Sequence, residues 1–151
     1  CWDGKTAPRI REYYYSGRDE CSNKTDEEYY MELEKLAGDL PVKSAVVDPS
    51  AASFIEVIRR HKRFPVKKAV NDVLPGIMTT ARYLQDGTVK IHRSCKDAIR
   101  EFGLYRWDEE STEDRPIKEN DHAMDDTRYF VMTILRHKVG KETYIPLYAR
   151  R

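Results

Sequence analysis

The chain has 151 residues, a length that fits one domain with an ordinary hydrophobic core. Lys and Arg number 27 against 26 Asp and Glu, and the net charge of +1 excludes a generally basic nucleic-acid coat while allowing a local basic patch. Three cysteines without a CxxC pair argue against a disulfide scaffold or a zinc ribbon. No apolar run approaches the roughly 18 residues of a membrane span, so we expect a soluble intracellular domain with no membrane partner.

Hydrophobic spacing and turn residues predict strands that alternate with helices along the chain. Short apolar or alternating runs indicate strands, and apolar residues at helical spacing after a capping residue indicate helices. This order predicts an α/β fold with a partly parallel sheet covered by helices. The predicted strands span 10–15, 42–48, 64–70, 88–92 and about 144–147, and the predicted helices span 25–36, 51–61, 72–85, 94–102 and 121–137.

Local signals fix some of these elements more closely. Thr25 and Glu28 have the spacing of a capping box at the start of the first helix. The apolar run 45–47 lacks alternation, which predicts a central strand buried on both faces. Asp3 and Gly4 form a turn dipeptide, so either the hairpin partner of the first strand lies before residue 1 or the N-terminus is irregular.

Asp48 is the first candidate for chemistry. It stands at the carboxyl end of a predicted buried strand, where open α/β sheets place their sites. Small residues and a predicted helix start follow at 49–52, so a phosphate group could approach closely there. The alternative is an ordinary helix cap that follows a strand, which is common.

His122 and Asp125 form the second candidate, because a spacing of three places both on one face of a helix. An oxygen-rich ligand set suits Mg²⁺ or Mn²⁺ better than zinc. The alternative is that acids simply favour a helix N-terminus through the helix dipole. Together with Asp48 they predict a metal site for two-metal phosphoryl chemistry, which needs at least one more carboxylate; Asp121 and Asp126 are candidates.

A basic stretch at 59–68 contains six cations and no acid. Such a stretch predicts contacts to the phosphate backbone of DNA. The alternative is a helix end whose cations complement the dipole, next to a solvated strand edge. The candidate DNA-binding residues are Arg59, Arg60, Lys62, Arg63, Lys67 and Lys68.

Three segments, in order along the chain, resemble the large terminase subunits of tailed phages. Residues 47–54 resemble the family's VDPSA segment, residues 68–77 resemble its KA-x-NDV-x-x-GI segment, and residues 121–129 resemble its DHAMDAxRY segment. Residues 12–15 and 24–29, which precede the first segment, also fit the family's sequence, so the similarity covers residues 12–129. Any one segment is weak evidence, whereas three in the family's order are specific.

The resemblance implies the C-terminal nuclease domain of that packaging motor, with an RNase H-like mixed sheet flanked by helices. Residues 1–151 would form this single domain, truncated at its N-terminus and without the packaging ATPase domain. Its activity would be metal-dependent cleavage of concatemeric double-stranded DNA with Mn²⁺ or Mg²⁺. By position, Asp48, His122 and Asp125 match the catalytic, metal-binding residues. The family's first metal-binding Asp lies on an upstream strand that this sequence lacks.

The family's setting implies a phage or prophage protein that works in the cytoplasm of the host cell. The implied partners are double-stranded DNA, the small terminase subunit, and the portal and procapsid. A competing hypothesis without catalysis is a DNA-binding or motor-docking module with an incomplete metal site. A junction resolvase of RNase H-like fold and a small-molecule hydrolase are two further hypotheses.

Overall fold

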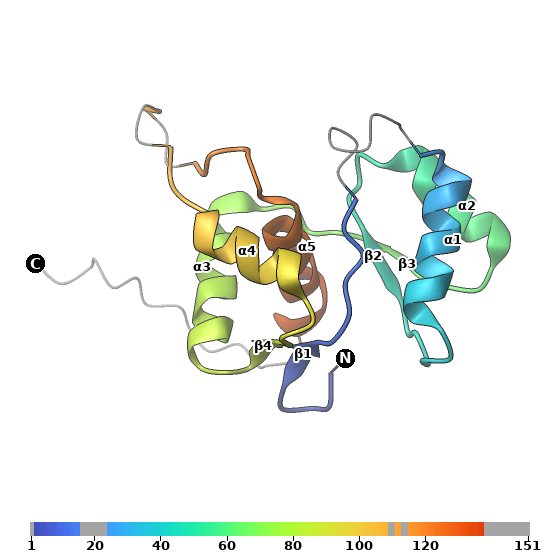
Figure 1. The fold of residues 1–151 in the computed structure, drawn as a ribbon, viewed down its shortest axis with the longest axis horizontal. Helices are drawn as coiled ribbons and strands as arrows, with labels where there is room; N and C mark the ends of the chain where they lie inside the picture. The colour runs from blue at the N-terminus through green and yellow to red at the C-terminus, as the bar shows by residue number, and fades with distance from the viewer. Residues whose placement is uncertain (1, 16–23, 109–110, 113–114, 138–151) are drawn as a thin grey trace, which may run out of the picture.

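The computed structural model of the protein describes residues 2–15, 24–108, 111–112 and 115–137. Strands and helices alternate along the chain, which confirms the predicted α/β class (Figure 1). The strands are β1 (Ala7–Arg9), β2 (Ala45–Val47), β3 (Val66–Lys68) and β4 (Val89–Ile91). The helices are α1 (Asp26–Ala37), α2 (Ala52–His61), α3 (Val73–Gln85), α4 (Lys96–Leu104) and α5 (His122–Phe130), which continues as the π-helix η1 (Val131–Leu135).

The four strands form two small parallel sheets. β1 pairs with β4, and β2 pairs with β3. Within the described ranges these sheets are separate, so the single mixed sheet expected from the resemblance is not seen there. The strand expected around 144–147 lies outside the described residues.

The first strand differs from its prediction in position. β1 ends at Arg9, and residues 10–15 run on without strand pairing. Their polar groups have another partner, because the Glu12 carboxylate accepts hydrogen bonds from the N–H groups of Asp97 and Ala98 at 2.8 and 3.1 Å. Glu12 thereby satisfies free N–H groups in the first turn of α4, as a capping side chain does.

Strand β2 is less buried than its apolar sequence predicted. Ala45, Val46 and Val47 are each half-buried, although a run of this kind is typical of a strand covered on both faces. The reason is that β2 pairs with β3 along one edge, and no second strand pairs with it among the described residues.

The capping box predicted for α1 is confirmed. The Thr25 hydroxyl accepts a hydrogen bond from the Glu28 N–H at 3.3 Å, and the Glu28 carboxylate accepts one from the Thr25 N–H at 2.7 Å. Both N–H groups would otherwise lack a partner at the helix N-terminus. Gly38 then ends the helix with a φ of 54°, a backbone conformation that favours glycine.

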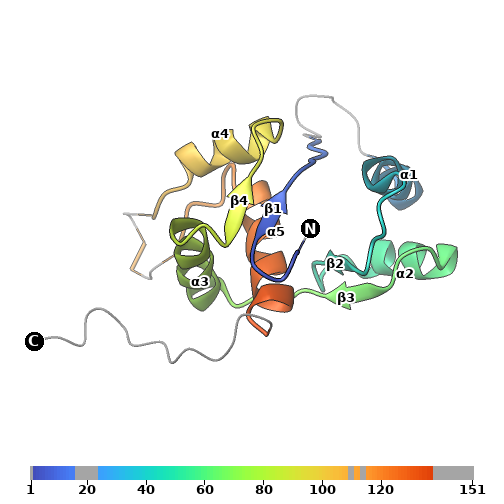
Figure 2. The ribbon, with the colours of Figure 1, turned by 90° about the horizontal axis from the view of Figure 1, so that it is seen from below.

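The elements pack in two groups that meet at α5. In Figures 1 and 2, α1 and α2 lie with β2 and β3, whereas α3, α4 and α5 surround β1 and β4. One core lies in the first group and two cores lie in the second. The buried apolar residues of the first are Tyr30, Ala37, Val57, Ile58 and Phe64; those of the second group are Ala7, Tyr83, Val89, Val131 and Leu135, with Cys95, Ala98 and Ala123 between α4 and α5.

The last helix was predicted as one α-helix, but its second half is wound as a π-helix. The Arg136 N–H donates to the Val131 carbonyl at 2.9 Å, which closes the wider turn. In this segment the Thr133 hydroxyl accepts a hydrogen bond from the Val70 N–H at 3.0 Å. The last helix therefore holds the chain where it leaves β3. No helix among the described residues is long and apolar enough to cross a membrane.

Candidate functional site

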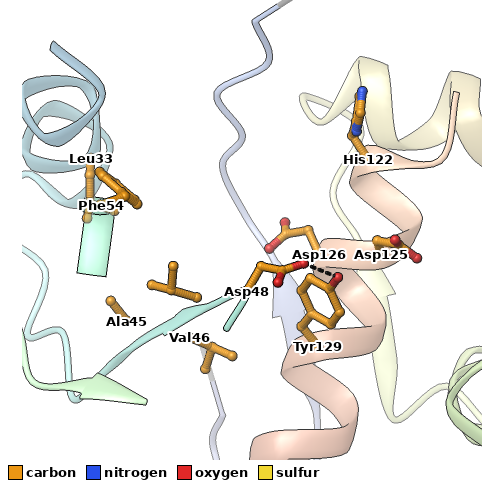
Figure 3. A pocket seen from close by; sticks show the side chains of 10 residues that line it. Leu33, Ala45, Val46, Asp48, Phe54, His122, Asp125, Asp126 and Tyr129 are labelled. Atoms are coloured by element: carbon orange, nitrogen blue, oxygen red, sulfur yellow. Dashed lines mark hydrogen bonds between the residues drawn. The ribbon is translucent and has the colours of Figure 1, made fainter. Parts of the chain in front are cut away.

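An open pocket of about 420 Å³ lies where the end of β2 faces α5. One wall is apolar and the other carries most of the polar groups (Figure 3). The parallel sheet brings Asp48 to this place, because the chain leaves β2 there and turns into α2. The apolar wall consists of Leu33, Ala45, Val46, Val47 and Phe54, and the polar residues are Asp48, His122, Asp125, Asp126 and Tyr129.

Asp48 has hydrogen-bond donors at both carboxylate oxygens. Oδ1 accepts from the Ser50 N–H at 2.8 Å, and Oδ2 accepts from the Tyr129 hydroxyl at 2.5 Å. These two donors, Tyr129 first, hold the pKa of Asp48 below its usual range because they favour the ionised form. Burial and the Asp48 carboxylate raise the pKa of Tyr129, so this hydroxyl keeps its proton at neutral pH. The pair presents a fixed, ionised carboxylate to the pocket.

Asp125 forms an ion pair with Arg128, which lies one turn further along α5. The guanidinium donates to Oδ1 through two nitrogens, at 2.8 and 3.2 Å. Oδ2 accepts no hydrogen bond within the described residues, so it is the oxygen that can bind a ligand. The Arg128 side chain is 3% exposed, and the Asp125 side chain is 34% exposed. The contact therefore joins a buried cation to the carboxylate of a residue that lines the pocket.

His122 and Asp126 lie at the same pocket with different surroundings. Asp126 forms an ion pair with Arg9 of β1 at 2.8 Å, and its side chain remains mostly exposed. His122 is 79% exposed, and its Nδ1 lies 3.8 Å from the Asp121 carboxylate. Figure 3 shows the His122 ring directed away from Asp48. The described conformation thus lines one pocket with Asp48, Asp125 and Asp126 and leaves His122 at the rim; Figure 3 shows the Asp126 carboxylate on the side of Asp48 and the Asp125 carboxylate directed away from Asp48.

The start of α5 is fixed by two further charged side chains. Glu101 of α4 is fully buried, and its carboxylate accepts a hydrogen bond from the Ala123 N–H at 2.6 Å. Arg9 donates to the Ala123 carbonyl and the Thr127 hydroxyl at 3.3 and 3.2 Å. Neither contact was anticipated from the sequence, and neither were Tyr129 and Arg128. Only the spacing of Arg128 three residues after Asp125 signals its ion pair.

The donor chemistry suits Mg²⁺ or Mn²⁺, which prefer carboxylate oxygens and waters. Mg²⁺ is commonly bound through one or two carboxylates together with waters and substrate phosphates, and Asp48 and Asp125 can provide that number. However, no three potential ligand side chains of the described residues lie close enough to form a metal centre. Asp48 and Asp125 therefore fit a site in which one metal ion has few protein ligands. A second metal ion would need a further protein ligand.

The basic stretch is divided between the two ends of the β2–β3 sheet. Lys68 pairs in register with Val47, so it lies beside Asp48 at the pocket end. Arg59 and Arg60 belong to the last turn of α2, which runs back from the pocket to the opposite end. Lys67 and Lys68 therefore lie in the strand beside β2, with Lys68 at the pocket end, whereas residues 59–63 lie further away.

Part of the stretch is also occupied by ion pairs with α1. His61 lies 2.8 Å from the Glu27 carboxylate, and Arg60 lies 3.7 Å from it. Arg63 contacts Glu34 at 3.1 Å and donates to the Gly38 carbonyl at 2.8 Å. These contacts join α1 to the end of α2, so Arg60 and Arg63 have partners within the fold that the sequence did not predict.

Comparison with known proteins finds the same fold in part of a large phage terminase. The structure of the large terminase of a thermophilic bacteriophage in complex with ADP matches with a TM-score of 0.84 and 44% sequence identity, over 89% of this chain. By sequence and fold, this chain corresponds to part of a phage terminase large subunit. The same thermophilic phage terminase in complex with ATP-gamma-S matches with a TM-score of 0.83 and 45% identity.

The match is partial for each of these relatives. This chain covers 35% of the thermophilic phage protein and 30% of the large terminase subunit of Escherichia phage T5, to which it is 24% identical over 132 residues. It therefore spans about a third of the length of the terminases it matches. No family model matches the chain.

Proposed function

We propose that this part of the terminase is a metal-dependent endonuclease that cuts concatemeric double-stranded DNA during packaging. The observation that carries the proposal is the pocket itself. Asp48 at the end of β2 and the acids of α5, more than 70 residues later, line one open, oxygen-rich pocket. The family resemblance noted from the sequence supports the same assignment. It also supports an RNase H-like fold, of which the two small sheets would be parts.

The proposed roles follow from what each side chain contacts. Asp48 and Asp125 would hold a Mg²⁺ or Mn²⁺ ion through their carboxylates, and the Tyr129 hydroxyl would orient that of Asp48. When bound, such an ion stabilises charge on a phosphoryl oxygen and lowers the pKa of a bound water. His122 at the rim would be a further metal ligand or would orient the attacking water, and Lys67 and Lys68 would contact the DNA backbone.

A non-catalytic DNA-binding or motor-docking module is the second candidate. It is favoured by the lack of a three-ligand cluster among the described residues. In this case the chain would bind duplex DNA, or another packaging component such as the small terminase subunit or the portal of the procapsid, without cutting. Its DNA affinity would fall steeply with salt, because phosphate contacts release counterions.

Cleavage of supercoiled plasmid at low salt separates the two functions. The wild-type protein is incubated with Mn²⁺, with Mg²⁺ or with EDTA, beside Asp48→Asn and Asp125→Asn. A third variant, Asp39→Asn, is the matched control because Asp39 is exposed after α1 and lies outside the pocket. The asparagine changes remove one charge each with little change of shape.

The nuclease predicts nicking that needs a metal, is retained in Asp39→Asn and is lost in both pocket variants. Nicking by a pure Asp48→Asn preparation at the wild-type rate would exclude the proposed site. DNA binding without cleavage under every metal condition would support the docking module instead.

A further inference from the structure

One buried charge near the pocket has no role in the proposed function. Arg128 lies on α5 with its side chain only 3% exposed, although an unpaired buried charge is strongly unfavourable. Its guanidinium is satisfied by three acceptors. Two of them are the Asp125 carboxylate and the side-chain carbonyl of Asn71, which accepts from both terminal nitrogens at 3.2 Å. The third is the Asp72 backbone carbonyl, also at 3.2 Å.

The stem of Arg128 passes over Gly76 in the first turns of α3. A Cβ atom built on Gly76 would lie 2.8 Å from both the Cγ and the Cδ of Arg128, closer than real Cβ contacts. The guanidinium also lies 4.8 Å from the centre of the Tyr129 ring, within the range of a cation–π contact. The missing side chain at Gly76 therefore leaves the room that the buried arginine needs.

We infer that residues 71–76 form a seat for Arg128, and that Arg128 is a positioning residue that fixes the orientation of the Asp125 carboxylate beside the pocket. Asn71 and Asp72 bind the guanidinium, and Gly76 admits its stem. Because the cation contacts only Oδ1, Oδ2 has no hydrogen bond within the described residues and is left for a ligand. The inference rests on the proposed function for the use of that oxygen, but the seat itself can be tested without metal.

The chain offers a matched pair of glycines for the test. Gly76 and Gly103 both lie within helices, and a Cβ on Gly103 would meet no atom within 4 Å. Alanine raises helix propensity at both positions, so the two changes differ mainly in the clash with Arg128. Asn71→Ala is a second variant that removes an acceptor on an exposed residue and leaves the helices intact.

The metal-free measurement is the Arg128 Nε–H resonance in ¹⁵N-labelled protein, followed with its exchange against solvent. We expect a protected resonance in the wild type and in Gly103→Ala. In Gly76→Ala and Asn71→Ala it should shift, and its exchange with solvent should be at least tenfold faster. An unchanged resonance in both variants would contradict the inference that residues 71–76 bind Arg128. If Gly76→Ala does not fold, the resonance in Asn71→Ala decides the question.

The second measurement is Mn²⁺ affinity, followed by the electron paramagnetic resonance of free Mn²⁺. We expect Gly76→Ala and Asn71→Ala to bind Mn²⁺ about 10-fold more weakly than the wild type, as is typical when a group that orients a metal ligand is lost. Gly103→Ala should bind like the wild type. Equal or tighter binding in the seat variants would overturn the positioning role, because the cation would then only repel the metal. A wild type that binds no Mn²⁺ would contradict the proposed function, while the Nε–H resonance would still decide the seat.

Discussion

Tyr129→Phe tests whether the pocket holds Asp48 through a charge-assisted hydrogen bond. The change removes one hydroxyl and keeps the ring, which lies beside Arg128. The oxygen–oxygen distance of 2.5 Å is in the range of a hydroxyl bonded to an ionised carboxylate. Such bonds contribute roughly 1.5–3 kcal/mol when shielded, and the half-buried position of Asp48 reduces this to about 1 kcal/mol.

The predicted loss depends on pH in a direction set by the Asp48 pKa. Because Tyr129 and Ser50 lower the pKa of Asp48 in the folded protein, ionised Asp48 stabilises the fold above the ordinary carboxyl pKa of about 4. This stabilisation is lost as the pH falls through the folded-state pKa. At pH 7 Tyr129→Phe should therefore unfold at a temperature about 2–4 °C lower than the wild type, and the difference should shrink below pH 4.

Thermal unfolding at pH 7 and at pH 3 measures the effect, and the ¹³C resonance of the Asp48 carboxyl carbon reports its pKa directly. The control is Tyr30→Phe, which removes a hydroxyl bonded to the Glu34 carboxylate at 2.9 Å, away from the pocket. The Asp48 pKa should rise in Tyr129→Phe and stay constant in Tyr30→Phe. Equal stability of Tyr129→Phe and wild type at pH 7, or a difference that does not change with pH, would refute the reasoning.

Three further predictions concern the core, a helix end and the basic strand. Leu135→Ala should lower the free energy of unfolding in urea by about 3 kcal/mol because the side chain is fully buried, whereas Leu104→Ala, at a half-exposed residue, should change it little. Thr25→Ala should cost about 1 kcal/mol of the same free energy by breaking the capping box, and should lower the helical circular dichroism of α1 on mild heating. Replacing Lys67 and Lys68 together by alanine should reduce the slope of log Kd for duplex DNA against log salt by about 2, and an unchanged slope would remove this strand from the DNA interface.

The sequence by itself determined the features that depend on neighbours along the chain. The capping box of Thr25 and Glu28 and the order of strands and helices follow from local hydrogen bonds and from apolar spacing. The sequence also predicted the position of Asp48 at the end of β2. The short apolar run 45–47 indicates a strand, and Pro49 ends it after Asp48. That these acids bind metal remains a prediction.

The tertiary structure decided which distant groups meet. It separated the strands into two sheets and placed residues 59–63 at the far end from Asp48. It also buried Arg128 and Glu101, two charged residues that any hydropathy pattern assigns to the surface. Their partners include Asn71, just before α3, and Ala123 of α5, each more than 20 residues away in sequence, and a buried charge is stable only where such partners converge. No periodicity along one helix contains that information, so only the packed structure could supply it.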